Sequence, residues 1–230
     1  MKKRITIQKI INHFDYEYFR LKFGDLLRKS LSKYRNKKLI NKDFTIISNN
    51  CWAGMVYESY NLPKMTPTVG LFFMADDYLN FIGDLHYYTS KELTFISPNR
   101  SKYYEQLKNS NRFGEYPIGI LDDVEVFFLH YHSEEEAKSK WTRRCKRINW
   151  DRLIVKMDDQ NGCQEFQARI FSKLSFKNKL FFTIHNDWNI ENWGGYYVIE
   201  QHTKDSSITA SHMPFGSNKY FDLTTIINSL

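Results

Sequence analysis

The sequence predicts an α/β fold: a three-layer, mostly mixed sheet with flanking helices, preceded by an amphipathic helical segment at the N-terminus. Three observations support this class. Of the 230 residues, 42% are hydrophobic and 17% are aromatic, which is enough apolar material for a large core. From residue 44 onward, short β-rich runs alternate with segments of helical periodicity. Such alternation places helices on both faces of a sheet, and the chain length fits one large domain.

The predicted N-terminal helical segment covers residues 1–42, and the α/β domain covers residues 43–230. Ile7 and Ile10 begin an apolar stripe with three- and four-residue steps, which Gly24 divides into two helices. This segment contains 13 basic and three acidic residues, 13 − 3 = +10, whereas the remainder has 20 − 23 = −3. The basic segment therefore predicts contact with an anionic membrane surface, the alternative being a solvated helix face.

The first half of the domain begins with a strand and a helix. Phe44-Thr-Ile-Ile-Ser48 is a β-rich run that ends in an Asn-Asn turn, and a helix follows over 51–60. Pro63 and Pro67 then require a loop. Further elements follow in order: a strand over 69–73, a helix over 76–85, a strand over 93–96, a turn over 97–100, and strands over 118–121 and 124–130.

The second half begins with the helix that the sequence indicates most clearly, over Ser133–Ile148. Ser133 and Glu136 have the spacing of a capping box, and Glu134 and Glu135 lie at the positive end of the helix dipole. Four basic residues lie near the other end, as the dipole favours. The remaining predicted elements are strands over 152–156, 180–184 and 196–200, and helices over 165–174 and 221–230.

Composition and missing motifs exclude several protein classes. Cys51, Cys145 and Cys163 cannot all pair within one chain, and no CxxC spacing occurs, so neither a zinc knuckle nor a disulfide framework is indicated. No run is long and apolar enough to span a membrane, and no secretion signal is present. We therefore expect a cytoplasmic protein, or one peripheral to the inner face of the membrane. The slightly acidic body argues against nucleic-acid binding.

Three blocks of sequence carry a resemblance to a known family. They are Ile46-Ile-Ser-Asn-Asn-Cys-Trp-Ala-Gly54, Tyr116-Pro-Ile-Gly-Ile-Leu-Asp-Asp-Val124, and Ser133-Glu-Glu-Glu-Ala137 with Trp141-Thr-Arg-Arg144. In this order they resemble a bacterial domain-of-unknown-function family labelled exopolysaccharide biosynthesis protein. The resemblance covers roughly residues 44–200. It implies an α/β fold and a role in making a capsule or another surface glycan, and it supplies no catalytic residues.

The turn after the first predicted strand is the strongest candidate for chemistry. Cys51 would lie at a helix N-terminus, where unpaired amides and the helix dipole stabilise a thiolate or an anion. The side-chain amides of Asn49 and Asn50 could donate to an oxyanion, and Trp52 could contact a substrate. The alternative is a buried cysteine with asparagine caps.

A nucleophilic cysteine requires a base. His130 and His132 are two residues apart at a strand end and so face the same side, which suits a catalytic histidine or one edge of a metal site, although no metal site is predicted. Asp187, after the strand over 180–184, could orient a histidine or bind a sugar hydroxyl. Two further roles are predicted: Trp188 and Trp193 as stacking platforms for substrate, and Arg144 as a phosphate ligand.

The resemblance implies surface-polysaccharide assembly, and with it these residues predict a transferase that acts on a nucleotide-linked or lipid-linked sugar, with acyl or related group transfer preferred. An equally economical version has no covalent step and uses only a histidine base and the asparagine amides. The alternative function is a non-catalytic glycan-binding or scaffold protein of the same machinery, whose basic N-terminal segment contacts the membrane or a glycosyltransferase. No Walker loop, GxGxxG fingerprint, HExxH or GxSxG motif is present, and the sequence indicates no particular cofactor.

Overall fold

The computed structural model describes residues 26, 29–110, 112–191, 193–199, 216–217 and 220–230. Most of the predicted N-terminal segment, including the stripe begun by Ile7 and Ile10 and the break at Gly24, lies outside these residues. The last part of the segment contacts the α/β body. Helix α3, Ser32–Lys37, is followed by Leu39, which is buried in the core. The Arg35 guanidinium donates a hydrogen bond of 2.7 Å to a backbone carbonyl of the body.

Helices and strands alternate along the chain much as predicted. In chain order after α3 they are β1 (Thr45–Ser48), α4 (Trp52–Ser59), α5 (Ala75–Gly83), α6 (Leu85–Ser90), β2 (Thr94–Ile96), the 3-10 helix η1 (Pro98–Arg100), α7 (Tyr104–Leu107), β3 (Ile118–Leu121), β4 (Val124–Phe127), α8 (Glu134–Cys145), β5 (Leu153–Asp158), α9 (Glu165–Lys173), β6 (Lys179–Thr183), β7 (Tyr196–Val198) and α10 (Leu223–Asn228).

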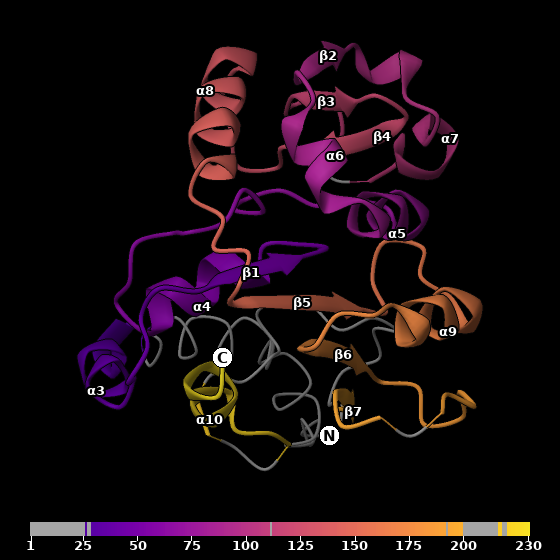
Figure 1. Ribbon diagram of the computed structural model, residues 1–230. Coiled ribbons are helices and arrows are strands. Elements are labelled where there is room, and N and C mark those ends of the chain that lie inside the picture. Colours follow the sequence, from indigo (N-terminus) through magenta and orange to yellow (C-terminus); the bar gives the residue numbers. More distant parts are fainter. Residues whose placement is uncertain (1–25, 27–28, 111, 192, 200–215, 218–219) are drawn as a thin grey trace, which may run out of the picture.

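The central sheet consists of four parallel strands in the order β1-β5-β6-β7 (Figure 1). Successive side chains in a strand point to opposite faces. Ile46 therefore packs with α4 and α10, whereas Ile47 packs with α5 and α9. Because helices cover both faces, these strands are apolar on both sides, as parallel strands usually are. The predicted three-layer α/β fold is confirmed.

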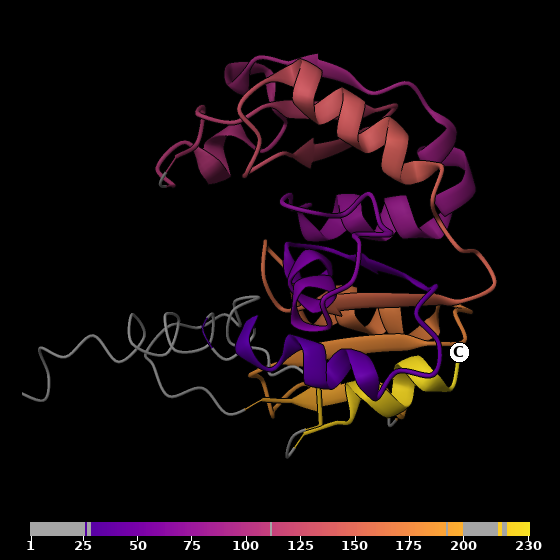
Figure 2. The same ribbon diagram turned by 90° about the vertical axis from the view of Figure 1, so that its left-hand side faces the viewer.

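The antiparallel strands form a second sheet beyond α5, in the order β2-β3-β4 (Figures 1 and 2). Asp122 and Asp123 connect β3 to β4, with Asp122 in the left-handed region at φ 60°. Ile118 and Phe127 belong to a separate small apolar cluster on this sheet. Parallel and antiparallel strands are therefore divided between two sheets instead of sharing one, although the other face of the antiparallel sheet packs into the same core as the parallel sheet.

Helix α8 has the predicted N-cap, but the capping box is incomplete, because the Glu136 carboxylate accepts from the His132 amide instead of the Ser133 amide. The Ser133 hydroxyl accepts a hydrogen bond of 3.1 Å from the Glu136 amide, and three glutamates occupy the first turn. Trp141 attaches the helix to the core through contacts with Phe81 and Phe128. Among the described residues, no helix has the length and apolar content needed to cross a membrane.

The segment 69–73 is extended but is not the predicted strand. It forms one isolated bridge, between Phe72 and Phe127, with backbone hydrogen bonds of 2.9 Å in both directions. Gly70, at φ 70°, turns the chain before this bridge, and the Phe73 amide donates to the Asn49 carbonyl after it. The segment therefore crosses between the two sheets instead of joining either one.

Candidate functional site

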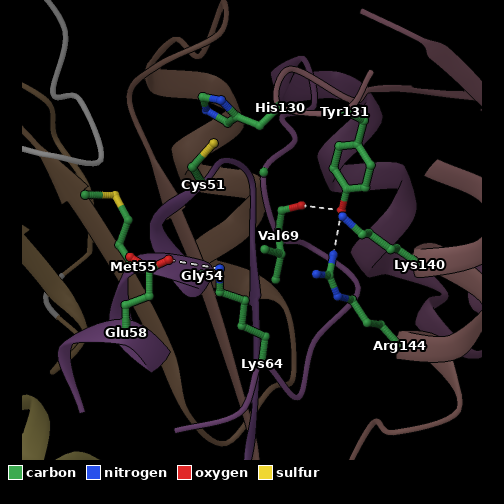
Figure 3. A pocket seen from close by; sticks show the side chains of 11 residues that line it. Cys51, Gly54, Met55, Glu58, Lys64, Val69, His130, Tyr131, Lys140 and Arg144 are labelled. Carbon is green, nitrogen blue, oxygen red and sulfur yellow. Dashed lines mark hydrogen bonds and ion pairs between the residues drawn. The ribbon is translucent and has the colours of Figure 1, made fainter. Parts of the chain in front are cut away.

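A pocket of about 450 Å³ lies between α4, the segment over 64–70 and α8 (Figure 3). Its volume is within the range of small-molecule sites. Three lining side chains are cationic and one is anionic, so we call it the cationic pocket. Its lining residues are Cys51, Gly54, Met55, Glu58, Lys64, Val69, Gly70, His130, Tyr131, Lys140 and Arg144.

Backbone pairing brings distant parts of the chain to this pocket. The His130 amide donates a hydrogen bond of 3.0 Å to the Gly70 carbonyl, next to the bridge at Phe72. Gly54 of α4 faces Val69 so closely that an added Cβ would lie 3.1 Å from the valine Cγ1. The structure thereby unites three predicted site residues, Cys51, His130 and Arg144, in one cavity.

Arg144 is the least neutralised cation of the pocket. Its Nη1 donates a hydrogen bond of 2.5 Å to the Tyr131 hydroxyl, which itself donates to the Val69 carbonyl at 2.6 Å. No carboxylate pairs with Arg144 among the described residues. Burial raises the pKa of Tyr131, so its hydroxyl stays neutral and leaves the positive charge uncompensated. A guanidinium has five N–H donors, and most of those on Arg144 remain for an anion.

The two lysines of the pocket are partly neutralised. Lys64 forms an ion pair of 2.9 Å with Glu58, and Lys140 pairs with Glu136 one helical turn earlier. Both pairs are partly exposed and therefore contribute little stability, and an incoming phosphate can compete for either lysine. The pocket thus has the charge of an anion site, with Arg144 as its strongest ligand.

Cys51 lies at the N-terminus of α4, as predicted, but its thiol is not activated. Burial raises its pKa to about 11, and the positive charge of Lys156 offsets this only in part. The sulfur lies 3.7 Å from the Leu71 carbonyl, to which the thiol donates. The expected stabilised thiolate is therefore absent, because loss of solvent outweighs the helix dipole here.

His130 is exposed at the same end of the pocket as the Cys51 thiol (Figure 3). Partial loss of solvent lowers the pKa of its imidazole, and the positive charge of Arg112 lowers it further. The ring is therefore mainly neutral at neutral pH and can accept a proton. His132 does not share this position, because the chain turns after β4. His132 is exposed beside α8 and lines no part of the pocket.

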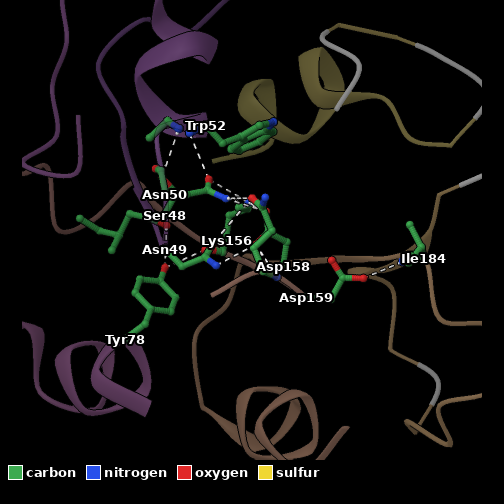
Figure 4. A network of polar contacts seen from close by, with 12 residues as sticks. Ser48, Asn49, Asn50, Trp52, Tyr78, Lys156, Asp158, Asp159 and Ile184 are labelled. Carbon is green, nitrogen blue, oxygen red and sulfur yellow. Dashed lines mark hydrogen bonds and ion pairs between the residues drawn. The ribbon is translucent and has the colours of Figure 1, made fainter. Parts of the chain in front are cut away.

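Asn49 and Asn50 form a buried network instead of an oxyanion site (Figure 4). Ser48 is in register with Lys156 on the neighbouring strand, so the residues after β1 lie beside the end of β5. Both side-chain amides donate to the Asp158 carboxylate at 2.8 Å. Because their donors point inward and at most 5% of each residue is exposed, they do not serve the pocket as predicted.

Lys156 is the most unusual member of this network. The residue is completely buried, and its Nζ lies 2.6 Å from a carboxylate oxygen of Asp158. The side-chain oxygens of Asn49 and Asn50 accept two longer bonds of 3.3 Å from the same ammonium. Burial lowers the pKa of Lys156, and the charge of Asp158 opposes that shift. The network fixes the turn that carries Cys51.

The predicted tryptophans lie away from the cationic pocket. Trp52 is completely buried against Phe182, with ring centroids 5.7 Å apart, so it cannot contact a substrate as predicted. Trp188 stacks on His185 at 4.4 Å, and Trp193 packs on the core. Both follow β6, whose far end does not reach the pocket.

Asp187 lies in this same loop after β6. Its carboxylate is 3.8 Å from Nδ1 of His185, and its side chain is 78% exposed. It therefore neighbours a histidine, but one that lies outside the cationic pocket. The described residues include no group of three or more histidine, cysteine or acidic side chains arranged to hold a metal ion.

Sequence reasoning missed several lining residues. Lys140 could have been found, because it lies four residues before Arg144 and therefore on the same face of the predicted helix. Tyr131 lies between the two predicted histidines but was not selected. Lys64 gave no signal, because it lies in a loop whose path depends on tertiary contacts.

Two comparisons place the chain among known proteins. A family described as domain of unknown function DUF1919 matches residues 23–230. A Haemophilus influenzae protein, described only as an uncharacterized protein, is 33% identical over 153 residues, which cover 66% of this chain and 68% of the relative. Neither description names a reaction or a substrate. The family match includes every described residue, and the chain therefore belongs to the DUF1919 family.

Proposed function

We propose that this protein is a transferase of surface-polysaccharide assembly that binds a phosphate-linked sugar donor in the cationic pocket. The single observation that carries the proposal is the convergence of Arg144, Lys64 and Lys140 on one cavity with a neutral histidine at its mouth. Nucleotide-linked and lipid-linked sugars both present the phosphate groups that such a pocket attracts. The assignment to surface glycans rests on the sequence resemblance described above.

The protonated Cys51 favours a mechanism without a covalent enzyme intermediate. An acceptor hydroxyl attacks the sugar carbon bonded to the phosphate oxygen, and His130 takes the hydroxyl proton. The bond between that carbon and the phosphate oxygen breaks, and its electron pair leaves with the phosphate. Arg144 and the two lysines stabilise the negative charge that develops on the leaving group. Sugar transfer from phosphate therefore suits these residues better than the acyl transfer preferred from sequence.

Binding and chemistry can be tested with separate variants. Titration of UDP-glucose or inorganic pyrophosphate into purified protein measures binding, and release of UDP from UDP-sugars measures turnover. Arg144→Gln should weaken binding by about 1.5–3 kcal/mol, the value of hydrogen bonds to charged groups. Arg143→Gln is the matched control, because Arg143 is an exposed neighbour on α8 that lines no part of the pocket.

His130→Gln should leave the affinity for donor nearly unchanged and lower the rate of UDP release. If donor affinity and the rate of UDP release fell together, His130 would contribute to binding and would not be the catalytic base. Binding that is equal in Arg143→Gln and Arg144→Gln, or absent throughout, would refute the pocket as a phosphate site.

One observation favours a non-catalytic alternative, a glycan-binding or scaffold protein. No hydrogen bond of a described residue orients the His130 imidazole, whereas catalytic histidines are usually held by a partner. In that case the pocket would bind the same donors, but no donor would be turned over and His130→Gln would change nothing.

We further propose that the basic N-terminal segment attaches the protein to anionic lipid or to a glycosyltransferase. Its charge of +10 carries this proposal. Flotation with phosphatidylglycerol vesicles should be lost when residues 1–42 are deleted, because seven of the 13 basic residues lie between residues 26 and 42. A melting curve shows whether the body still folds without α3 and Leu39, and a folded chain without residues 1–42 that still floats would exclude this anchor.

A further inference from the structure

A second cavity, of about 640 Å³, lies on another side of α8 and takes no part in the proposed transfer. It is bounded by α6, by the segment over 91–93, and by the chain from α8 to Trp150. We call it the aromatic pocket, after the His86–Trp150 pair at its edge. Helical geometry separates it from the cationic pocket: Lys140 and Arg144 face one cavity, whereas Trp141 and Cys145 face the other.

The His86–Trp150 pair forms a stacked aromatic surface at the edge of the pocket. The two rings stack with centroids 3.8 Å apart and an interplanar angle of 21°. Asn149 fixes the backbone beside the indole. Its backbone N–H donates to Thr45 Oγ1 at 2.8 Å, and its side-chain Nδ2 donates to the Asp43 carboxylate at 2.9 Å. Trp150 nevertheless remains 38% exposed. A positioned, accessible indole next to a cavity suits stacking against the C–H face of a sugar ring.

Three lysines from two helices, α6 and α8, line the aromatic pocket. Lys91 lies at the end of α6, Lys138 within α8 and Lys146 at its C-terminal cap, and Glu92 is the only lining carboxylate. Lys138 pairs with Glu92 at 2.7 Å in an exposed and therefore weak ion pair. Lys146 has no ion pair among the described residues. Spread charges of this kind match carboxylates distributed along a chain, whereas a nucleotide diphosphate requires cations gathered at one point.

We propose that the aromatic pocket binds an acidic oligosaccharide, in which a sugar ring stacks on Trp150 and uronate carboxylates meet the lysines. The proposal does not depend on catalysis in the cationic pocket. If both proposals hold, the protein binds an anionic glycan in the aromatic pocket while sugar transfer takes place in the cationic pocket.

The test is calorimetric titration of the full chain with trigalacturonate, with maltotriose as the neutral counterpart and UDP as the nucleotide counterpart. Trp150→Ala should weaken trigalacturonate binding about tenfold or more, and Lys146→Gln should weaken it less and reduce its salt dependence. Trp188→Ala is the matched control, because Trp188 also stacks on a histidine but lines neither cavity. Melting curves establish that each variant is folded. If Trp150→Ala does not fold, Lys146→Gln replaces it as the test variant.

Saturable binding of trigalacturonate that falls in Trp150→Ala and not in Trp188→Ala supports the proposal. Three results would overturn it: no saturable binding, equal affinity for maltotriose, or a loss in Trp150→Ala that affects UDP alone. Arg144→Gln separates this test from that of the proposed function, because it should weaken UDP-glucose binding and leave trigalacturonate binding unchanged.

Discussion

Replacing Asp158 by asparagine removes the only charge that directly compensates the buried Lys156 among its described contacts. The carboxylate accepts hydrogen bonds from four groups: the Asn49 and Asn50 amides, the Lys156 ammonium and the Gln160 backbone. Asparagine has nearly the same shape but no negative charge. The ammonium would then have only neutral amide oxygens as partners, including those of Asn49 and Asn50 at 3.3 Å, and no carboxylate of a described residue in contact.

Removing one partner of a buried ion pair costs about 3–5 kcal/mol, and we expect Asp158→Asn to lie in this range. Lys156→Met should cost less, about 1–3 kcal/mol, because the carboxylate left behind keeps its bonds from Asn49, Asn50 and Gln160. Asp158→Asn should therefore destabilise the protein more than Lys156→Met does, because the carboxylate has other hydrogen-bond donors whereas the ammonium has no other carboxylate in contact among the residues that the structure describes.

The pH dependence gives a second check. Burial lowers the pKa of Lys156, and removal of Asp158 takes away the largest of the charges that oppose this shift. Between the folded-state pKa and the ordinary value, the unfolded chain binds more protons, so the free energy of unfolding increases with pH. The difference in the free energy of unfolding between the unmodified protein and Asp158→Asn should therefore become smaller toward alkaline pH.

Urea unfolding curves of the three proteins at several pH values measure both effects. The reasoning is refuted if Asp158→Asn loses less than about 1 kcal/mol, which is the net value of an ordinary hydrogen bond. It is also refuted if the difference between the unmodified protein and Asp158→Asn grows with pH, or if Lys156→Met is the more damaging change.

Three further predictions use other parts of the structure. Cys51, with a pKa of about 11, should be alkylated by iodoacetamide more slowly than free cysteine at neutral pH; peptide mass spectrometry measures this, and faster labelling would contradict it. Gly119→Ala should lower the free energy of unfolding by about 1–3 kcal/mol, because the new Cβ would lie 2.6 Å from Leu93. Gly83→Ala should raise it by about 0.4–1 kcal/mol, because no atom lies within 4 Å of the new Cβ. Equal shifts of the melting temperature in the two variants would refute this description of the packing. Ser133→Ala should cost about 1 kcal/mol through loss of the α8 cap, and an unchanged unfolding curve would exclude that contribution.

Local signals in the sequence were enough for most elements. Helix α8 was predictable because its cap and its end charges are all encoded within sixteen residues, from Ser133 to Ile148. The segment 69–73 looked like a strand for the same kind of local reason, its apolar and aromatic residues. Whether such a segment joins a sheet depends on a partner elsewhere, and here Gly70 and the bond to Asn49 decide against it.

The candidate site was only partly predictable. Cys51, His130 and Arg144 were each selected for local reasons, and the fold brings them together across more than 90 residues of chain. The burial of Cys51 and the inward hydrogen bonds of Asn49 depend on β5, whose position beside β1 no local pattern reveals. A lysine within the apolar run of β5 was the one available clue to the buried network around Asp158.

Helix α8 supplies side chains to two cavities at once, Arg144 to the cationic pocket and Lys138 to the aromatic pocket. A helix behaves as a nearly rigid rod, so a ligand that moves it on one side moves the lining of the other. Affinity changes transmitted in this way are reciprocal: the factor by which the first ligand alters binding of the second equals the reverse factor. If both proposed ligands bind, a glycan at Trp150 that shifts α8 would change the affinity for the donor without contacting it.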